Sequence, residues 1–95
     1  MSNVNSDYLN KLLNAKQIVL DRMKANPSYV VYQSVEAQLD YIISVIQGSC
    51  SDRRRLKDVN LGIYAVREFE GTDDELSKAL KEVHFIVYTI TGGAI

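Results

Sequence analysis

Apolar residues recur at helical spacing through most of this chain, and the stretches are separated by proline or glycine. A spacing of three and four residues places such side chains on one face of a helix. Asn26-Pro27 ends the first stretch, because proline lacks an amide hydrogen and the residue before it disfavours helical geometry. Gly48, Gly71 and Gly92 follow the later stretches. The pattern predicts an all-α fold, a compact antiparallel bundle of about four main helices with a short extra helical turn.

Polar residues with capping capacity mark where the first helices begin. Ser6 can cap the first helix, whose first turn carries Asp7 at the positive end of the helix dipole. The second helix is expected to begin between Ser28 and Ser34 and to run to Gln47. A helix that is apolar on two faces, as this one is, either lies centrally in a bundle or carries an interface.

A third helix is expected after Asn60, which can cap it, and before Gly71. Leu61 and Phe69 share one of its faces at helical spacing. Gly62 lies inside this segment, where glycine costs about 1 kcal/mol relative to alanine. We therefore expect another helix to pack closely at this position.

The last helix has the clearest start signal in the chain. Thr72 and Glu75 match a capping box, in which the two side chains satisfy each other's backbone amides. Phe85 lies opposite the apolar stripe of this helix, and Tyr88 lies to its side. The β-branched run from Val87 to Ile90 also permits a short strand, but the continuing stripe favours a helix.

Length and composition indicate one domain. A chain of 95 residues is expected to form a single helical domain over 1–95, with residues 1–5 frayed and 92–95 as a tail. We expect no secretory signal, because no basic region precedes an apolar run at the N-terminus. No apolar stretch approaches the roughly 18–20 residues that span a bilayer. With a single cysteine, the chain fits a reducing cytoplasm.

No catalytic set can be assembled from the sequence. The chain has one histidine, His84, and one cysteine, Cys50, which nearly excludes a zinc site built from these residue types. A partly buried or surface histidine is the simpler interpretation of His84, and an incidental thiol that of Cys50. There is no phosphate-binding glycine-rich loop and no metalloprotease motif. The sequence therefore predicts no enzymatic activity, no metal and no cofactor.

The basic cluster comprises Arg53, Arg54, Arg55 and Lys57, in a short helical turn expected to begin at Ser51. Such a cluster could bind phosphates. Adjacent residues on a helix point in different directions, however, and no aromatic side chain is interleaved for base stacking. A net charge of −1 also argues against a dedicated nucleic-acid binder. An ordinary solvated turn is favoured, and an antitoxin-like regulator that binds nucleic acid through this cluster is the alternative.

Two other surfaces are candidates for protein contact. Tyrosine is favoured at interfaces, and Tyr41 with Val45 one turn later lies off the core stripe of its helix. If Tyr41 is instead buried between helices, the pair is structural. An acidic run around Gly71 is either a solvated corner or a charge-complementary patch for a basic partner. The run contains Glu68, Glu70, Asp73, Asp74 and Glu75, and the first four form the candidate contact surface.

Three segments, QLDYI (38–42), AVREF (65–69) and TDDELSKALK (72–81), together resemble a known family. The chain is similar, from about Tyr29 to Tyr88, to small helical immunity proteins of bacterial type VI secretion systems. Those proteins neutralise an effector whose toxin domain hydrolyses NAD(P)+. The resemblance implies an all-helical fold, no enzymatic activity, cytoplasmic residence and inhibition by binding at or over the NAD-binding cleft of the toxin.

A cleft that binds a pyrophosphate is expected to present cationic or amide donors, and carboxylates of a blocking protein can satisfy them. We therefore expect a cognate effector toxin domain as the partner, with no nucleic acid and no membrane, and with a homodimer as a further possibility. The loop from Ser49 to Arg55 is the alternative contact surface. The expected contact residues are Tyr41, Val45, Glu68, Glu70, Asp73 and Asp74.

Overall fold

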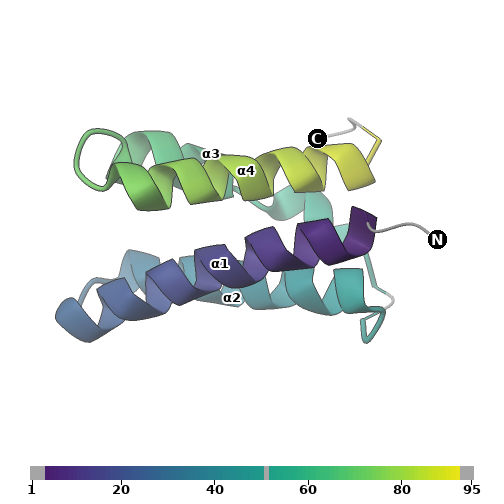
Figure 1. Ribbon diagram of the computed structural model, residues 1–95, viewed down its shortest axis with the longest axis horizontal. Helices are drawn as coiled ribbons and strands as arrows, with labels where there is room; N and C mark the ends of the chain where they lie inside the picture. The colour runs from purple at the N-terminus through teal and green to yellow at the C-terminus, as the bar shows by residue number, and fades with distance from the viewer. Residues whose placement is uncertain (1–3, 51, 93–95) are drawn as a thin grey trace.

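A computed structural model describes residues 4–50 and 52–92, and within them the chain forms four α-helices and two short helical turns without a strand (Figure 1). The turn η1 is a 3₁₀ helix, and η2 is a π-helical turn that continues α3. The all-α prediction is confirmed. The elements are α1 (Val4–Ala25), α2 (Val30–Gln47), η1 (Arg54–Asp58), α3 (Leu61–Tyr64), η2 (Ala65–Phe69) and α4 (Asp74–Ile90).

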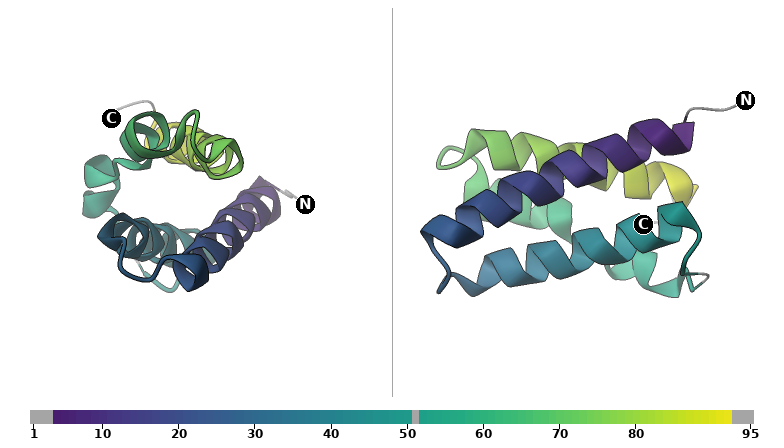
Figure 2. Two further views of the ribbon diagram at one scale, coloured as in Figure 1. Left: turned by 90° about the vertical axis from the view of Figure 1, so that its left-hand side faces the viewer. Right: turned by 60° about the horizontal axis from the view of Figure 1, so that its bottom comes forward.

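The helices form two antiparallel pairs. Helices α1 and α2 run side by side in opposite directions, and α3 with η2 runs opposite to α4 (Figures 1 and 2). Helix α4 also packs against α1, which joins the two pairs. The turn η1 carries the chain from the end of α2 to the start of α3 (Figure 2). The predicted antiparallel bundle is therefore present.

One apolar core joins every element of the fold. The aliphatic stripes predicted from helical spacing supply most of it, and each fully buried side chain contributes roughly 1.5–3 kcal/mol through removal from water. The fully or almost fully buried aliphatic residues include Leu12 and Val19 of α1, Leu39 and Ile42 of α2, Leu56 of η1, Leu61 of α3, and Leu80 and Val83 of α4.

The expected ends of the first two helices are mostly confirmed. Helix α1 ends directly before Asn26-Pro27, and α2 ends at Gly48, which adopts a left-handed φ of 81°. The cap assigned to Ser6 is wrong, because α1 already begins at Val4 and Ser6 lies inside it. Of the segment expected to fray, residues 1–3 lie outside the described residues, as do 93–95 of the expected tail.

The capping box assigned to Thr72 and Glu75 is also wrong. Helix α4 begins one residue later than a Thr72 cap requires, so Asp73 is the N-cap and its carboxylate accepts from the backbone amide of Leu76 at 3.3 Å. The Thr72 hydroxyl instead donates to the main-chain oxygen of Glu68 at 3.0 Å, at the end of the preceding turn. Glu75 is turned toward α1, where it pairs with an arginine.

The β-branched run from Val87 to Ile90 is helical, so the strand interpretation is excluded for it. Ser51, from which the short extra turn was expected to begin, lies outside the described residues. The turn itself, η1, begins at Arg54, whose backbone amide donates to the Asp52 carboxylate at 3.0 Å. The extra helical turn is thus present, slightly later in the chain than expected.

Candidate functional site

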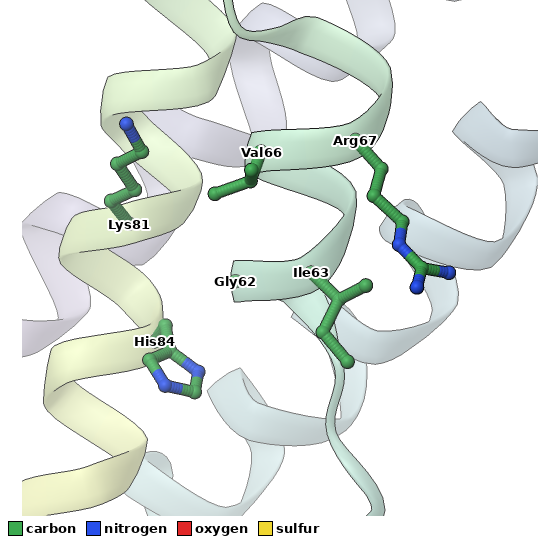
Figure 3. A pocket seen from close by; sticks show the side chains of 6 residues that line it. All are labelled: Gly62, Ile63, Val66, Arg67, Lys81 and His84. Carbon is green, nitrogen blue, oxygen red and sulfur yellow. The ribbon is translucent and has the colours of Figure 1, made fainter.

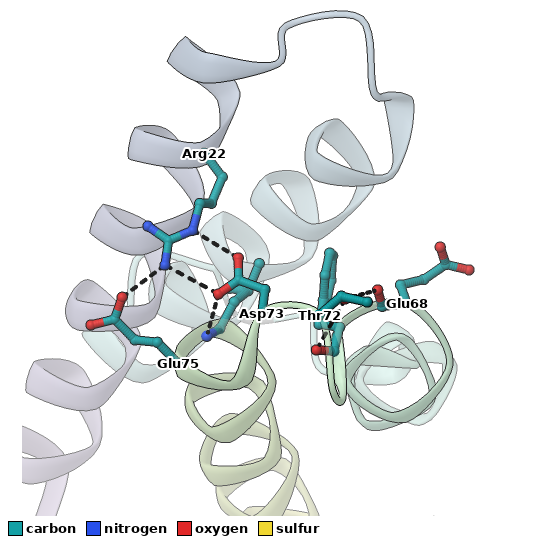
Figure 4. A network of polar contacts seen from close by, with 7 residues as sticks. Arg22, Glu68, Thr72, Asp73 and Glu75 are labelled. Carbon is teal, nitrogen blue, oxygen red and sulfur yellow. Dashed lines mark hydrogen bonds and ion pairs between the residues drawn. The ribbon is translucent and has the colours of Figure 1, made fainter.

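Asp73 of the predicted acidic patch joins α1 to the start of α4. Arg22 donates from Nε and Nη2 to the two carboxylate oxygens of Asp73 at 2.7 and 3.1 Å, and its Nη2 also reaches Glu75 at 2.8 Å (Figure 4). This hydrogen bonding holds the pKa of Asp73 below its usual range. Asp73 therefore acts as a helix cap and as an interhelical clamp at the same time.

The other carboxylates of this patch also have partners within the chain. The Tyr29 hydroxyl donates to Glu68, and this bond, with burial, raises the pKa of Tyr29 to about 12. Glu70 pairs with Lys81 at 2.7 Å. Asp74 accepts at 2.7 Å from the backbone amide three residues before it. The patch is therefore largely structural, and its contact with a partner stays a prediction.

Tyr41 is partly buried rather than free. Its hydroxyl donates to the main-chain oxygen of Asp52 at 2.8 Å, and the Arg55 guanidinium carbon lies 5.0 Å from its ring centroid, within range of a cation–π interaction. Val45, its predicted companion, also packs against the core. The geometry favours the structural interpretation of this pair, whose role in partner binding stays a prediction. No hydrogen bond or ion pair among the described residues joins Tyr41 to the acidic patch.

The basic cluster is divided by contacts within the chain. Arg54 pairs with Asp52 at 3.1 Å and keeps the pKa of that carboxyl below its usual range. Arg55 lies over Tyr41, while Arg53 and Lys57 are exposed. Two of the four cations thus have local partners, which weakens the support for a phosphate-binding surface. Cys50 is partly buried, with its Sγ 3.6 Å from the main-chain oxygen of Asp52.

Exposed apolar side chains are concentrated on the second helix pair. Six large apolar residues in the described part of the chain are highly exposed, and four of them lie on α3, η2 and α4. These are Ile63 (53% exposed), Val66 (56%), Phe85 (67%) and Tyr88 (46%). Contiguous exposed apolar surface is typical of interaction sites. The second helix pair is therefore the best candidate for a binding face.

A groove of about 470 Å³ opens between α3–η2 and α4. We define the α3–α4 groove by its lining residues. In Figure 3, His84 and Lys81 extend from α4, with Gly62 and Val66 facing them from the opposite element. The lining residues are Gly62, Ile63, Val66, Arg67, Lys81 and His84.

Gly62 is what allows the two walls of the groove to approach. A Cβ added to this glycine would lie 2.9 Å from Cγ of the His84 ring, closer than real contacts allow. The close helix packing expected at Gly62 is therefore confirmed. The ring of His84 is partly buried, and its Nδ1 has no hydrogen-bond partner among the described residues.

The ionisable side chains of the groove are Arg67, Lys81 and His84, and no carboxylate lines it. Lys81 pairs with Glu70, which lies outside the groove. Arg67 is exposed and forms no ion pair within residues 4–50 and 52–92. The groove thus combines an apolar lining with an unneutralised arginine at its edge.

Ile63 and Val66 are not among the contact residues expected from the sequence. The signal was present, because both fall off the stripe formed by Leu61, Ala65 and Phe69 and are three residues apart. That spacing places them on a common outer face of one helical segment. The sequence did identify Phe85 as lying opposite the core stripe of its helix, and its exposure confirms this.

The described residues hold no cluster of three or more histidine, cysteine or acidic side chains that could bind a metal ion. No helix among them is long and apolar enough to cross a membrane. An all-helical chain with an exposed apolar groove has the form of a protein-binding module. A family model described as Tsi6 matches residues 5–89, and the chain belongs to the Tsi6 family.

Relatives of known structure share both sequence and fold. The Immune protein Tsi6 of Pseudomonas aeruginosa (strain PAO1) is 41% identical over 80 residues, which are 84% of this chain and 82% of that protein. A chain of a solved structure described as Tse6 in complex with Tsi6 matches with a TM-score of 0.84 and 40% identity, covering 90% of this chain and 92% of that one.

A structure of Tsi6 from Pseudomonas aeruginosa matches with a TM-score of 0.81 and 37% identity, over 92% of this chain and 95% of that one. Matches of this extent in both sequence and structure confirm the resemblance to the type VI immunity proteins. They also confirm the helical fold.

Proposed function

We propose that this chain binds the toxin domain of a cognate type VI effector and blocks its NAD(P)+ glycohydrolase active site. The observation that carries this proposal is its kinship with the Immune protein Tsi6, at 41% identity over 84% of the chain. A structural match to the complex of Tse6 with Tsi6 supports binding to a toxin as the means of protection. The chain would act in the cytoplasm of the producing cell, where such a toxin consumes its substrate.

The arrangement of side chains supports a stoichiometric inhibitor rather than an enzyme. The buried Nδ1 of His84 has no hydrogen-bond partner among the described residues, and the Cys50 thiol contacts the main-chain oxygen of Asp52, so no hydrogen bond joins the two as base and nucleophile there. A specific complex of ordinary size buries about 800 Å² on each partner, and the second helix pair offers exposed apolar surface for such a contact.

Co-production with the toxin domain encoded by the neighbouring reading frame tests the proposal. Cells that make the toxin domain alone should lose NAD(P)+ and stop growing, whereas cells that also make this chain should keep both. The two proteins should co-purify at equal stoichiometry. Depletion of NAD(P)+ despite an excess of this chain would reject the proposal, as would hydrolysis of NAD+ by the purified chain alone.

A further inference from the structure

We infer that the α3–α4 groove is the surface that receives the toxin, and that the toxin fills it with an apolar side chain flanked by a carboxylate. This inference rests on the proposed function and adds the site and the chemistry of the contact. It differs from both surfaces expected from the sequence, whose side chains have partners within the chain.

The groove leaves apolar surface exposed to water. Ile63 and Val66 lie on one outer face of the α3–η2 segment, and each keeps about half of its surface exposed. Tyr88 continues the exposed apolar surface along α4, one turn after His84, whereas Phe85 lies on the α1 side of α4, in a separate hollow with Tyr8 and Lys11. Removal of such surface from water is the main favourable term in association, and aromatic side chains are enriched at the centre of interfaces.

The groove is already formed in the free chain. The inner face of the α3–η2 segment is anchored by Leu61, Ala65 and Phe69, all buried in the core. The buried Ser77 hydroxyl donates to the main-chain oxygen of Ala65 at 2.9 Å and ties α4 to η2. Binding to a groove that is already formed costs less conformational entropy than binding to a groove that becomes ordered only when the partner enters.

The charge of the groove favours an anionic partner. Arg67 and Lys81 are cations, and no carboxylate lines the groove. Arg67 has no ion-pair partner in the described part of the chain, so its guanidinium is free to bind a carboxylate through two parallel hydrogen bonds. Enzymes that hydrolyse glycosidic bonds use carboxylates against a cationic transition state. A glycohydrolase cleft with such a carboxylate, beside the donors that hold the pyrophosphate, would supply the anion that this groove lacks.

The same charges argue against a second copy of this chain as the occupant. In a two-fold symmetric dimer the same patch meets itself, so a dimer formed through the groove would place the unpaired Arg67 of each copy against a surface whose lining has no carboxylate. Like charges placed opposite one another at an interface are unfavourable. The toxin is therefore the better partner for this surface.

Calorimetric titration of four variants against the purified toxin domain encoded by the neighbouring reading frame tests the inference. Val66→Asp and Arg67→Glu change the groove. Val30→Asp and Lys24→Glu are the matched controls, because Val30 is 68% exposed on α2 and Lys24 is exposed near the end of α1. All four positions are exposed, so the melting temperatures should stay close to that of the original chain.

We expect each groove variant to weaken binding at least tenfold and each control to stay within about twofold, in line with the loss of a central contact. Added salt should weaken binding of the original chain and strengthen that of Arg67→Glu, because salt screens attraction in one case and repulsion in the other.

The outcomes are distinguishable. Equal affinity for groove variants and controls would overturn the inference and leave the proposed function intact. Loss of binding by Val66→Asp with no effect of Arg67→Glu would overturn the assignment of a carboxylate. If sedimentation showed that the free chain is a dimer and that Val66→Asp is a monomer, the groove would be a dimer interface and the inference would be overturned. Failure of the original chain to bind the toxin domain would overturn both proposals.

Discussion

The ring of His84 lies directly against Gly62, so that a Cβ at position 62 would fall 2.9 Å from the ring Cγ and 3.0 Å from Nδ1. This contact sets the spacing between α3 and α4 and therefore the width of the groove. Glycine is otherwise unfavourable within a helix by about 1 kcal/mol relative to alanine. Close packing on His84 is the physical reason for its presence.

Gly62→Ala should lower the free energy of unfolding by about 1–2 kcal/mol, because overpacking against the His84 ring outweighs the gain in helix propensity. The double variant Gly62→Ala/His84→Ala should be more stable than the sum of the two single changes predicts. Urea unfolding of the three variants measures this coupling. Additive effects would show that the ring does not limit the space at Gly62.

Asp73→Ala should destabilise the chain by about 1–2 kcal/mol, because it removes the cap of α4 and also the partner of Arg22. Thr72→Ala should have a smaller effect, because its hydroxyl only supports the end of the preceding turn. Denaturant unfolding compares the two. A larger effect of Thr72→Ala would favour the capping box that the sequence pattern suggested.

Acid should weaken the fold through Asp73. Its pKa is lower in the folded chain than in the unfolded chain, so its contribution is fully present above the unfolded pKa of about 3.9. That contribution is lost as the pH falls through the lower folded pKa. As the pH is lowered through this range, the free energy of unfolding should therefore decline less steeply for Asp73→Asn than for the original chain. An unchanged slope would show that Arg22 does not stabilise the ionised carboxyl.

Tyr41→Phe should lower the stability of the free chain by about 1 kcal/mol, because the hydrogen bond to the Asp52 carbonyl is lost while the ring is kept. The affinity for the toxin domain should stay within about twofold. Thermal melting and titration of the same sample separate the two effects. Weaker binding at unchanged stability would restore Tyr41 as a partner contact, as the sequence suggested.

Leu80→Ala should cost roughly 2–5 kcal/mol, because Leu80 is fully buried in the core. Phe85→Ala, on the same helix but 67% exposed, should change stability by less than about 1 kcal/mol. Chemical denaturation of both variants checks the assignment of the two faces of α4. A smaller loss of stability for Leu80→Ala than for Phe85→Ala would mean that α4 is rotated about its axis.

The sequence by itself determined the helices, most of their ends and the family. The aliphatic spacing of α2 and α4 encodes which face is buried, and Asn26-Pro27 and Gly48 terminate helices through their own backbone geometry. Such signals act between residues a few positions apart, so they can be interpreted without knowledge of the fold. The side-chain caps were the exception. Asp73 takes the position expected for Thr72, α1 begins before Ser6, and the Asn60 side chain accepts from Gln38 instead of capping α3.

Only the tertiary structure decided what the polar and exposed side chains do. Arg22 and Asp73 are separated by 51 positions, and Tyr29 and Glu68 by 39, yet these contacts turn an expected interaction patch into a structural clamp. Helical spacing is enough to place Ile63 on the outer face of its helix. It does not show that Ile63 lines the same groove as His84 and Lys81. Contacts between distant segments depend on how the helices pack, and packing is the part of the fold that no local pattern encodes.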